Sequence, residues 1–322
     1  MAKNGFWKSL FSSLQRVAPN PELDAAVERV VDAIDPKLKL AGGYPQRYRQ
    51  AVAHALAYTR DLARQVPGPV TINREAYTKD PFIRAIFASP DEFQAALCMS
   101  RAMQDYLKGH TCTIGSQLYA MVGMRRREKG VIGMEVIGDS VRHDVAQTAV
   151  CFSDHTLTNI ANSEAGTRDQ LAWSFMDSLL GQVSDRIEQL KQAKQDLDQK
   201  RGELMARLRS ADPEQQAHLQ AELDRTLAEL REATEKLDLR RYADYLDAVL
   251  LQPEAHLRLE AATLYLDDMG IKRNNGNGRE IHFVDMIGRD RRRWSIALLH
   301  CQSPGVVSMT DRLQEASRWM DI

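Results

Sequence analysis

The sequence has few cysteines, and none of them are closely spaced. Four cysteines are spread over 322 residues, at Cys98, Cys112, Cys151 and Cys301, and no CxxC pair occurs. A disulfide framework needs a denser set, and zinc sites or dithiol redox motifs need close pairs. The cysteines therefore favour reduced thiols in a cytoplasmic protein.

Long apolar runs are also missing. No stretch reaches the roughly 20 apolar residues that a membrane-spanning helix requires. Residues 1–20 have neither a long apolar core nor a small-residue cleavage site, so they make a poor secretory signal. We expect a cytoplasmic protein, with a peripheral position on a membrane as the alternative.

Neither sign of charge is in excess. The chain has 43 Lys and Arg residues against 44 Asp and Glu residues, which gives a formal net charge of -1. This balance excludes a protein that binds polyanions over its whole surface, although it leaves room for local basic patches.

The motifs of common enzymes are absent as well. The sequence contains no Walker loop, GxSxG, HExxH or GxGxxG after a strand. His143, Cys151, Asp154 and His155 lie near predicted strand ends and are weak candidates for a catalytic site, but their spacing matches no tight ligand motif. We therefore expect no metal and no cofactor.

Helix signals dominate the first hundred residues. Asn20 followed by Pro21 is typical of a helix start, and residues 21–34 carry an apolar stripe at helical spacing. A second helix is predicted over residues 45–66. Further helices are predicted to begin at Asp80 and at the capping box of Ser89 and Glu92, the last one running to residue 107.

Strand signals follow in two blocks. Runs at residues 117–124, 131–137 and 145–152 predict an antiparallel meander of three strands, with charged residues 125–129 in a turn. Strands are also predicted at residues 257–272, 280–287 and 294–300.

Between these blocks, residues 167–250 have the pattern of two antiparallel helices. Thr167 with Gln170 predicts the start of the first helix, and Asp212 with Pro213 predicts the start of the return helix. Apolar residues recur at 4-3 spacing and make the narrow seam of a coiled coil, interrupted by Lys194 and Arg201. We predict that a partner or a second copy binds here, through Val183, Ile187, Leu190, Lys194, Leu197, Arg201, Leu204, Leu208, Leu219, Leu223 and Leu230. The alternative is a hairpin that packs only within its own chain.

These elements predict an α+β fold. A helical N-terminal region and antiparallel strands form one body, made of residues 19–166 and 251–322, and residues 167–250 are an inserted antiparallel coiled-coil hairpin. We favour one body over two α+β domains because the C-terminal part alone is too small to bury much core. Residues 1–18 are assigned to a separate amphipathic helix.

The apolar face of that N-terminal helix is rich in aromatic residues, and all of its charges are basic. The face consists of Phe6, Trp7, Leu10, Phe11 and Leu14. Such a helix is typical of binding to anionic lipid. Its short apolar face also suits docking into a protein groove, which we favour.

Two arginine clusters lie in predicted turns. They are Arg125, Arg126 and Arg127, and Arg291, Arg292 and Arg293. Cations at the tips of hairpins can bind the phosphates of lipid or nucleic acid, although charged turns are commonly just solvated. No aromatic platform of the single-strand-binding kind accompanies them, so nucleic acid is the least favoured partner.

Together these patterns favour architecture over chemistry. We predict a non-enzymatic assembly or adaptor protein that self-associates or docks a protein partner through its helical hairpin. The first alternative is a peripheral membrane or polyanion-binding protein that uses the N-terminal helix and the arginine clusters. The second alternative is a metal-dependent or Cys/His-dependent enzyme.

Overall fold

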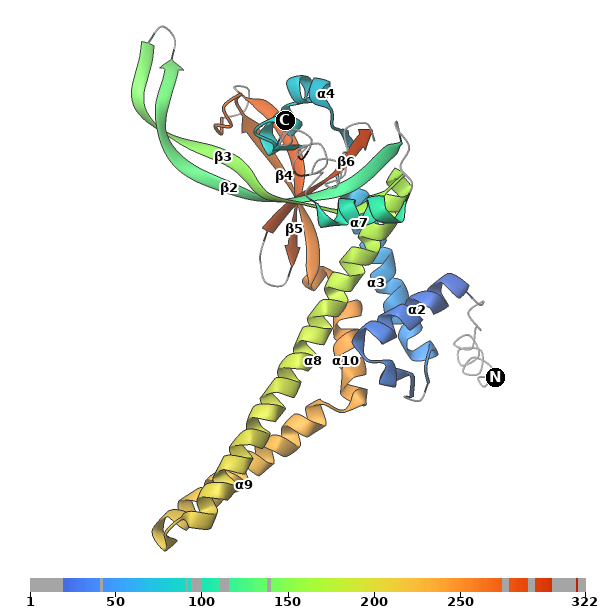
Figure 1. The fold of residues 1–322 in the computed structure, drawn as a ribbon, viewed down its shortest axis with the longest axis vertical. Helices are drawn as coiled ribbons and strands as arrows, with labels where there is room; N and C mark the ends of the chain where they lie inside the picture. Colours follow the sequence, from blue (N-terminus) through green and yellow to red (C-terminus); the bar gives the residue numbers. More distant parts are fainter. Residues whose placement is uncertain are drawn as a thin grey trace, which may run out of the picture. The chain divides into compact units, whose positions relative to one another are not determined.

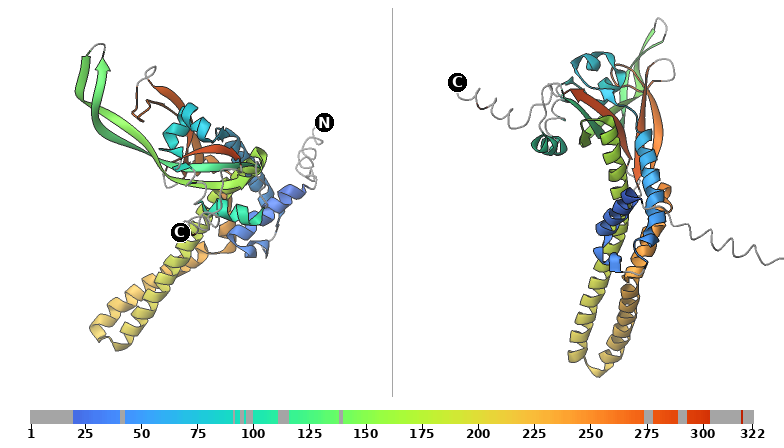
Figure 2. Two further views of the ribbon diagram at one scale, coloured as in Figure 1. Left: turned by 45° about the horizontal axis from the view of Figure 1, so that its top comes forward. Right: turned by 90° about the vertical axis from the view of Figure 1, so that its right-hand side faces the viewer.

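The computed structural model describes residues 20–40, 43–90, 92–93, 96, 100–110, 116–137, 140–273, 278–288, 293–302 and 317. Within them the protein has the predicted α+β fold, with N-terminal helices, a sheet and a long helical hairpin (Figures 1 and 2). The chain divides into two compact units, Met1–Ala55 with Leu179–Gln252 and Leu56–Ser178 with Pro253–Ile322. The domain boundaries that the sequence suggested, at residues 18, 166 and 250, stay predictions.

Helices make up the described part of the first unit. They are α2 (Pro21–Ile34), the 3-10 helix η1 (Pro36–Leu40), the first part of α3 (Gln46–Gln65), most of α8 (Glu164–Ser210), α9 (Pro213–Lys236) and α10 (Leu239–Leu250). The predicted start of α2 is confirmed, because the Leu23 N–H donates to Asn20 Oδ1 at 3.2 Å and Pro21 occupies the first turn.

The helices α8 and α9 form the predicted antiparallel hairpin and lie side by side in every view (Figures 1 and 2). The predicted start at Thr167 is wrong by one turn. Ser163 Oγ accepts the Gly166 N–H at 3.2 Å, α8 begins at Glu164, and Thr167 is fully buried inside the helix. Asp212 is the N-cap of α9 as predicted, although its side chain makes no capping hydrogen bond.

The return arm consists of two helices, where the pattern predicted one. α9 ends at Lys236, and α10 starts at Leu239. Asp238 caps the new start, since its Oδ1 accepts the Arg240 N–H at 2.8 Å. The first N–H groups of a helix have no partner within the helix. An aspartate that accepts a hydrogen bond from one of them therefore favours the start of a new helix at this position.

Six strands of the described residues form one sheet, in the order β3-β2-β6-β5-β4 with β1 beside β6. They are β1 (Val70–Thr71), β2 (Gln117–Ile137), β3 (Ser140–Ala161), β4 (Leu257–Leu266), β5 (Arg279–Gly288) and β6 (Arg293–Gln302). Neighbours in that order are antiparallel, as predicted, while β1 pairs with β6 in parallel. β6, the last of these strands in the sequence, therefore lies inside the sheet.

The predicted meander of three strands over residues 117–152 is wrong. β2 and β3 are 21 and 22 residues long and pair along their lengths as one ribbon, with residues 125–129 inside β2. That segment has none of the Gly, Pro, Asn or Asp residues that favour turns. Successive side chains of a strand point to opposite faces of the sheet. Arg126 is accordingly half-buried, while its neighbours Arg125 and Arg127 are exposed on the other face.

Three β-bulges occur along this ribbon. The register between β2 and β3 shifts by one residue at three points, and β3 carries the extra residue each time. Asp144, Asp154 and Asn159 lie at these points with φ of 61°, 56° and 55°. Asp and Asn adopt this left-handed conformation more readily than other non-glycine residues. Bulges bend a strand, and the ribbon is visibly curved in Figure 1.

The main core of the second unit lies between one face of the sheet and the short helices α5 (Pro81–Ile86) and α7 (Arg101–Gly109), with α4 (Arg74–Lys79) next to α5. Alternate residues of β2 supply that face: Leu118, Ala120, Val122 and Met124. On the opposite face Val284, Ile296 and Leu298 are buried too. The centre of the sheet is thus covered on both sides.

Two predicted helix starts in this region are confirmed. Asp80 Oδ1 accepts the Phe82 N–H at 2.8 Å, and Ser89 Oγ accepts the Glu92 N–H at 3.1 Å. α7 has a start of its own at Ser100, so the prediction of one helix from residue 89 to 107 is wrong.

Candidate functional site

The β2–β3 ribbon continues past the strands that flank it. β2 lies beside β6 from Gln117 to Met124, and no strand of the described chain pairs with that edge of β2 from residue 125 onward. β3 is supported as far as residues 148–150, which two backbone hydrogen bonds of 2.8 Å join to residues 270–272. We call the part past this support, residues 131–137 and 140–147, the outer ribbon. It curves away from the sheet at the upper left of Figure 1.

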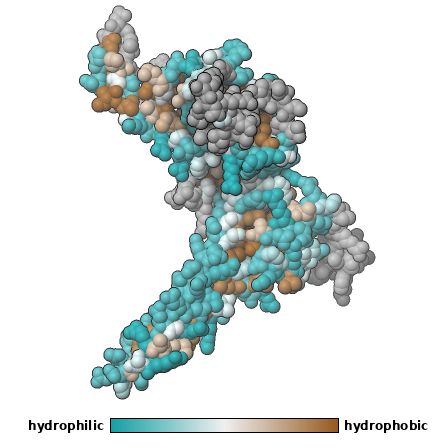
Figure 3. All heavy atoms as spheres, viewed as in Figure 1, coloured by the Kyte–Doolittle hydropathy of each residue, from teal (hydrophilic) through white to brown (hydrophobic). Residues whose placement is uncertain are grey.

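One face of the outer ribbon is apolar and exposed. Ile132 is 76% exposed, Met134 62% and Val141 54%. Ile132 and Met134 are two positions apart on β2 and therefore share a face. Val141 of β3 is paired with Val136, which lies two positions further along β2, so Val141 belongs to the same face. Figure 3 shows hydrophobic residues gathered near this end of the ribbon. Clustered apolar side chains on the surface are typical of interaction sites.

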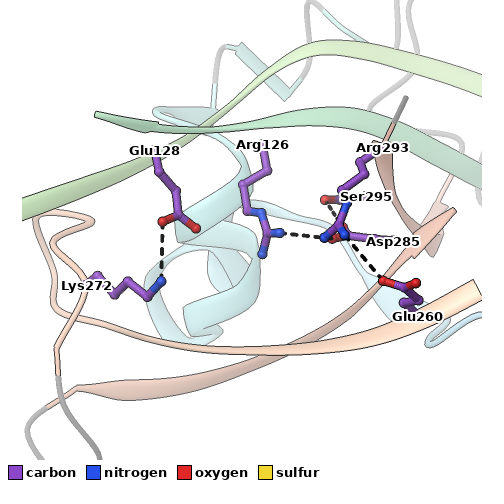
Figure 4. A network of polar contacts seen from close by, with 7 residues as sticks. All are labelled: Arg126, Glu128, Glu260, Lys272, Asp285, Arg293 and Ser295. Carbon is purple, nitrogen blue, oxygen red and sulfur yellow. Dashed lines mark hydrogen bonds and ion pairs between the residues drawn. The ribbon is translucent and has the colours of Figure 1, made fainter. Parts of the chain in front are cut away.

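A buried ion-pair network lies at the base of the ribbon (Figure 4). Asp285 on β5 is 2% exposed, and it accepts hydrogen bonds from Arg126 on β2 at 2.9 Å and from Ser295 on β6 at 2.7 Å. The Arg126 guanidinium also lies over the Phe283 ring, 5.1 Å from its centroid. A buried carboxylate needs such partners, so Asp285 ties together three strands at the point where the ribbon leaves the sheet.

The predicted anion-binding cluster on β2 has carboxylate partners within the chain. Arg126 is paired with Asp285, and Arg125 and Arg127 lie 3.8 and 3.4 Å from Asp154. Asp154 reaches both because it occupies a bulge opposite them. Much of the local positive charge is therefore balanced.

The second arginine cluster is described only in part. Arg293 lies 3.6 Å from Glu260 and 4.0 Å from Asp285. Figure 4 places these three residues in one network. Arg291 and Arg292 lie outside the described residues. Anion binding by either cluster stays a prediction.

The four candidate catalytic residues do not form one site. His143 and Cys151 are exposed, Asp154 is engaged with two arginines, and His155 Nε2 lies 2.7 Å from the carbonyl oxygen of Ile86. No hydrogen bond joins any two of these four described residues. Across the described chain, no group of three or more His, Cys, Asp or Glu side chains is placed to hold a metal ion. A catalytic role for the four stays a prediction.

The seam of the helical hairpin is covered by the hairpin itself. Leu204 of α8 packs with Leu219 and Leu223 of α9 in one buried cluster. Val183, Ile187 and Leu230 are also buried, Leu190, Lys194, Leu197 and Leu208 are half-buried, and Arg201 is exposed. The two cations in the seam both pair with Asp198 on their own helix, at 3.0 and 3.2 Å. Partner binding through these residues stays a prediction, and much of the seam is already occupied.

The N-terminal residues Phe6, Trp7, Leu10, Phe11 and Leu14 lie outside the described residues, so their docking role also stays a prediction. In the part of the chain that the structure describes, no helix has the length and apolar character needed to cross a membrane.

Sequence reasoning missed the outer ribbon, because it placed a turn at residues 125–129. The signal that could have found it is Gly138-Asp139, a dipeptide typical of two-residue hairpin loops, between the apolar runs that contain Ile132 and Val141. The surfaces described above are the basis for a functional proposal, since comparisons with protein-family models, curated proteins and solved structures find no match for this chain.

Proposed function

We propose that this chain is a non-enzymatic assembly protein that pairs with a second copy of itself through the outer ribbon. The observation that carries the proposal is the exposed apolar face of Ile132, Met134 and Val141 on a two-stranded ribbon. Two-stranded ribbons are marginally stable in water, and further strands stabilise them. A second ribbon would supply these strands, and its own Ile132 and Met134 would cover part of the apolar face from the side.

The edge of β2 with which no described strand pairs from residue 125 onward supports a specific arrangement. A two-fold axis at Ile132 would pair the two β2 edges antiparallel, which makes a four-stranded sheet from two ribbons. Ile132 would then lie beside its symmetry mate, and Met134 would lie opposite Gly130 of the partner. Gly130 has open space where a Cβ would be, so it leaves room for the methionine.

The expected strength is moderate. Complete burial of a large apolar side chain contributes about 1.5 to 3 kcal/mol, and the edge-to-edge pair would bury Ile132 and Met134 of each copy in part. Association costs about 4 to 15 kcal/mol in lost rotational and translational freedom. The two ranges overlap, so we expect a reversible dimer whose population depends on protein concentration.

The test is the molar mass of the full chain by light scattering over a series of concentrations. We expect the wild type to approach the mass of a dimer and Ile132→Lys to remain a monomer, because the substitution puts two charges at the axis. The matched control is Val131→Lys, which adds the same charge on the opposite face and keeps the dimer. A wild type that is monomeric at every concentration, or equal loss in both variants, would contradict the proposal.

A further inference from the structure

A cavity of about 330 Å³ lies in the second unit, away from the outer ribbon. Helices α4 and α5, strand β3 and the connection from β4 to β5 surround it. Its lining includes apolar side chains that belong to the core or its border, namely Ile86, Val150, Phe152, Leu266 and Ile281. Ligand-binding pockets commonly combine such an apolar lining with a few polar groups.

Two arginines at this cavity share one carboxylate. Arg84 lies 3.0 Å from Asp268, and Arg279 lies 3.4 Å from the same Oδ1 atom. The three side chains are 29%, 48% and 62% exposed in the order Arg84, Arg279, Asp268. The two arginines together carry one more charge than the carboxylate that they share.

The other two acidic residues that line the cavity, Asp267 and Glu92, accept hydrogen bonds of their own. Asp267 accepts the N–H groups of Met269 and Ile271 at 2.9 Å each and pairs with Arg273. Partial burial raises the pKa of Asp267, but these hydrogen bonds and the arginine together lower it by more, so the pKa lies below its usual value. Glu92 accepts the Ala88 N–H at 2.6 Å.

Asp268 has a different position in the same turn. Asp267 fixes the turn through backbone hydrogen bonds, whereas Asp268 pairs with the side chains of Arg84 and Arg279. Its exposed carboxylate can turn into solvent without breaking the backbone bonds of the turn. Met269, the next residue, also lines the cavity and is 85% exposed, so a flexible apolar side chain stands beside the cavity.

We propose that this cavity binds an organic anion, a carboxylate with an apolar body. The head group takes the position of the Asp268 carboxylate between Arg84 and Arg279, and the body lies on the apolar lining and under Met269. Guanidinium groups bind carboxylates by two parallel hydrogen bonds, and two of them converge here.

The experiment measures binding of octanoate to the full chain by isothermal titration calorimetry. Wild type binds octanoate, and Asp268→Ala binds it about threefold or more tightly, because the competing carboxylate is gone. Arg84→Ala and Arg279→Ala each bind about tenfold more weakly. The control Arg258→Ala removes a half-exposed arginine that pairs with Glu260 away from the cavity, and it leaves affinity unchanged.

Cys151 supplies a second readout, since its exposed thiol lines the cavity. Octanoate slows its alkylation by iodoacetamide, measured on the Cys151 peptide by mass spectrometry. Weaker binding by Asp268→Ala, no protection of Cys151, or inorganic phosphate binding as tightly as octanoate overturns the proposal. The phosphate result would mean that the site holds an anion without an apolar body.

Discussion

Asp285 is the residue on which the junction of three strands depends. Its carboxylate is buried and receives hydrogen bonds from Arg126 and Ser295, which belong to different strands. A buried ion pair adds little net stability over a well-packed apolar pair, but the loss of one partner leaves the other charge buried alone. The network therefore matters more for where the strands meet than for how stable the fold is.

Asp285→Ala should lower the free energy of unfolding by about 3 to 5 kcal/mol. The substitution removes the buried carboxylate that pairs with Arg126 and leaves the charge of this half-buried arginine without that partner. Urea denaturation of the full chain measures the change. Glu260→Ala is the control, since it removes a more exposed carboxylate of the same surroundings and should change the value by less than about 1 kcal/mol. Equal effects of the two substitutions would show that burial of Asp285 has no special cost.

Cys301 and Cys151 should differ in reactivity. Burial raises the pKa of the Cys301 thiol to about 11, so at pH 8 only about a thousandth of it is thiolate. Cys151 is exposed, and peptide mass spectrometry should find it alkylated far faster. In the unfolded chain the Cys301 thiol ionises at a lower pH than in the folded protein. Its contribution to stability is therefore fully present below about pH 9 and is lost as the pH rises to about 11. Similar alkylation rates for both residues would contradict the burial of Cys301.

Sequence reasoning succeeds at this scale where the interaction is local. The caps Asn20, Asp80 and Ser89 bond to backbone N–H groups two or three residues away, so their role is visible in the sequence. The pairing of Arg126 with Asp285 joins residues 159 positions apart. It depends on the strand register, which no local pattern reports.

At the scale of elements, the bulges in β3 set the course of the ribbon. Each extra residue shifts the pairing with β2 by one position, and each is placed at an Asp or Asn with positive φ. The sequence pattern treats these residues as strand ends or turns. The prediction of three strands failed for this reason, and because a charged run was read as a turn although it lacks turn residues.

Substitutions of Asp144 test the importance of the bulge in the outer ribbon. Asp144→Gly should leave stability nearly unchanged, because glycine adopts positive φ freely, while Asp144→Val should cost about 1 to 2 kcal/mol. Amide hydrogen exchange in residues 131–147 is the measurement, since the ribbon can open without global unfolding. Unchanged exchange in Asp144→Val would show that the register shift survives without a residue suited to that conformation.

At the scale of the whole molecule, two surfaces compete for the role of contact between copies. The hairpin of α8 and α9 was the prediction from sequence, and the outer ribbon is the proposal from structure. A deletion at the tip of the hairpin can distinguish the two surfaces. Lys200 pairs with Glu222 across the hairpin, and this pair shows which residues of the two helices are neighbours. Residues 197–224 can therefore be removed as one end of the hairpin.

Deletion of residues 197–224, with a short Gly-Ser linker joining residues 196 and 225, should leave the dimer intact by light scattering. The removed residues pack on one another in the cluster of Leu204, Leu219 and Leu223, so their loss exposes little new apolar surface. Loss of the dimer in this variant, with the dimer kept in Ile132→Lys, would return the role to the hairpin. Circular dichroism checks that both variants are folded.

The α+β class and the hairpin could be predicted because both follow from periodicity and helix caps. The strand order could not. β6 lies between β2 on one side and β5 and β1 on the other, which combines residues from three distant parts of the chain. Periodicity identifies a strand but says nothing of its neighbours.

The inner position of β6 has a consequence for synthesis on the ribosome. β2 and β5 are both made before β6, yet each needs β6 as its neighbour, so the sheet cannot close until residue 302 has left the ribosomal exit tunnel. The edge of β2 that faces β6 stays open until β6 has been made, and open strand edges invite aggregation. The hairpin of α8 and α9 needs only neighbouring sequence and can form during that wait. We therefore expect that edge of β2 to be the part of the nascent sheet most prone to aggregation until β6 is made.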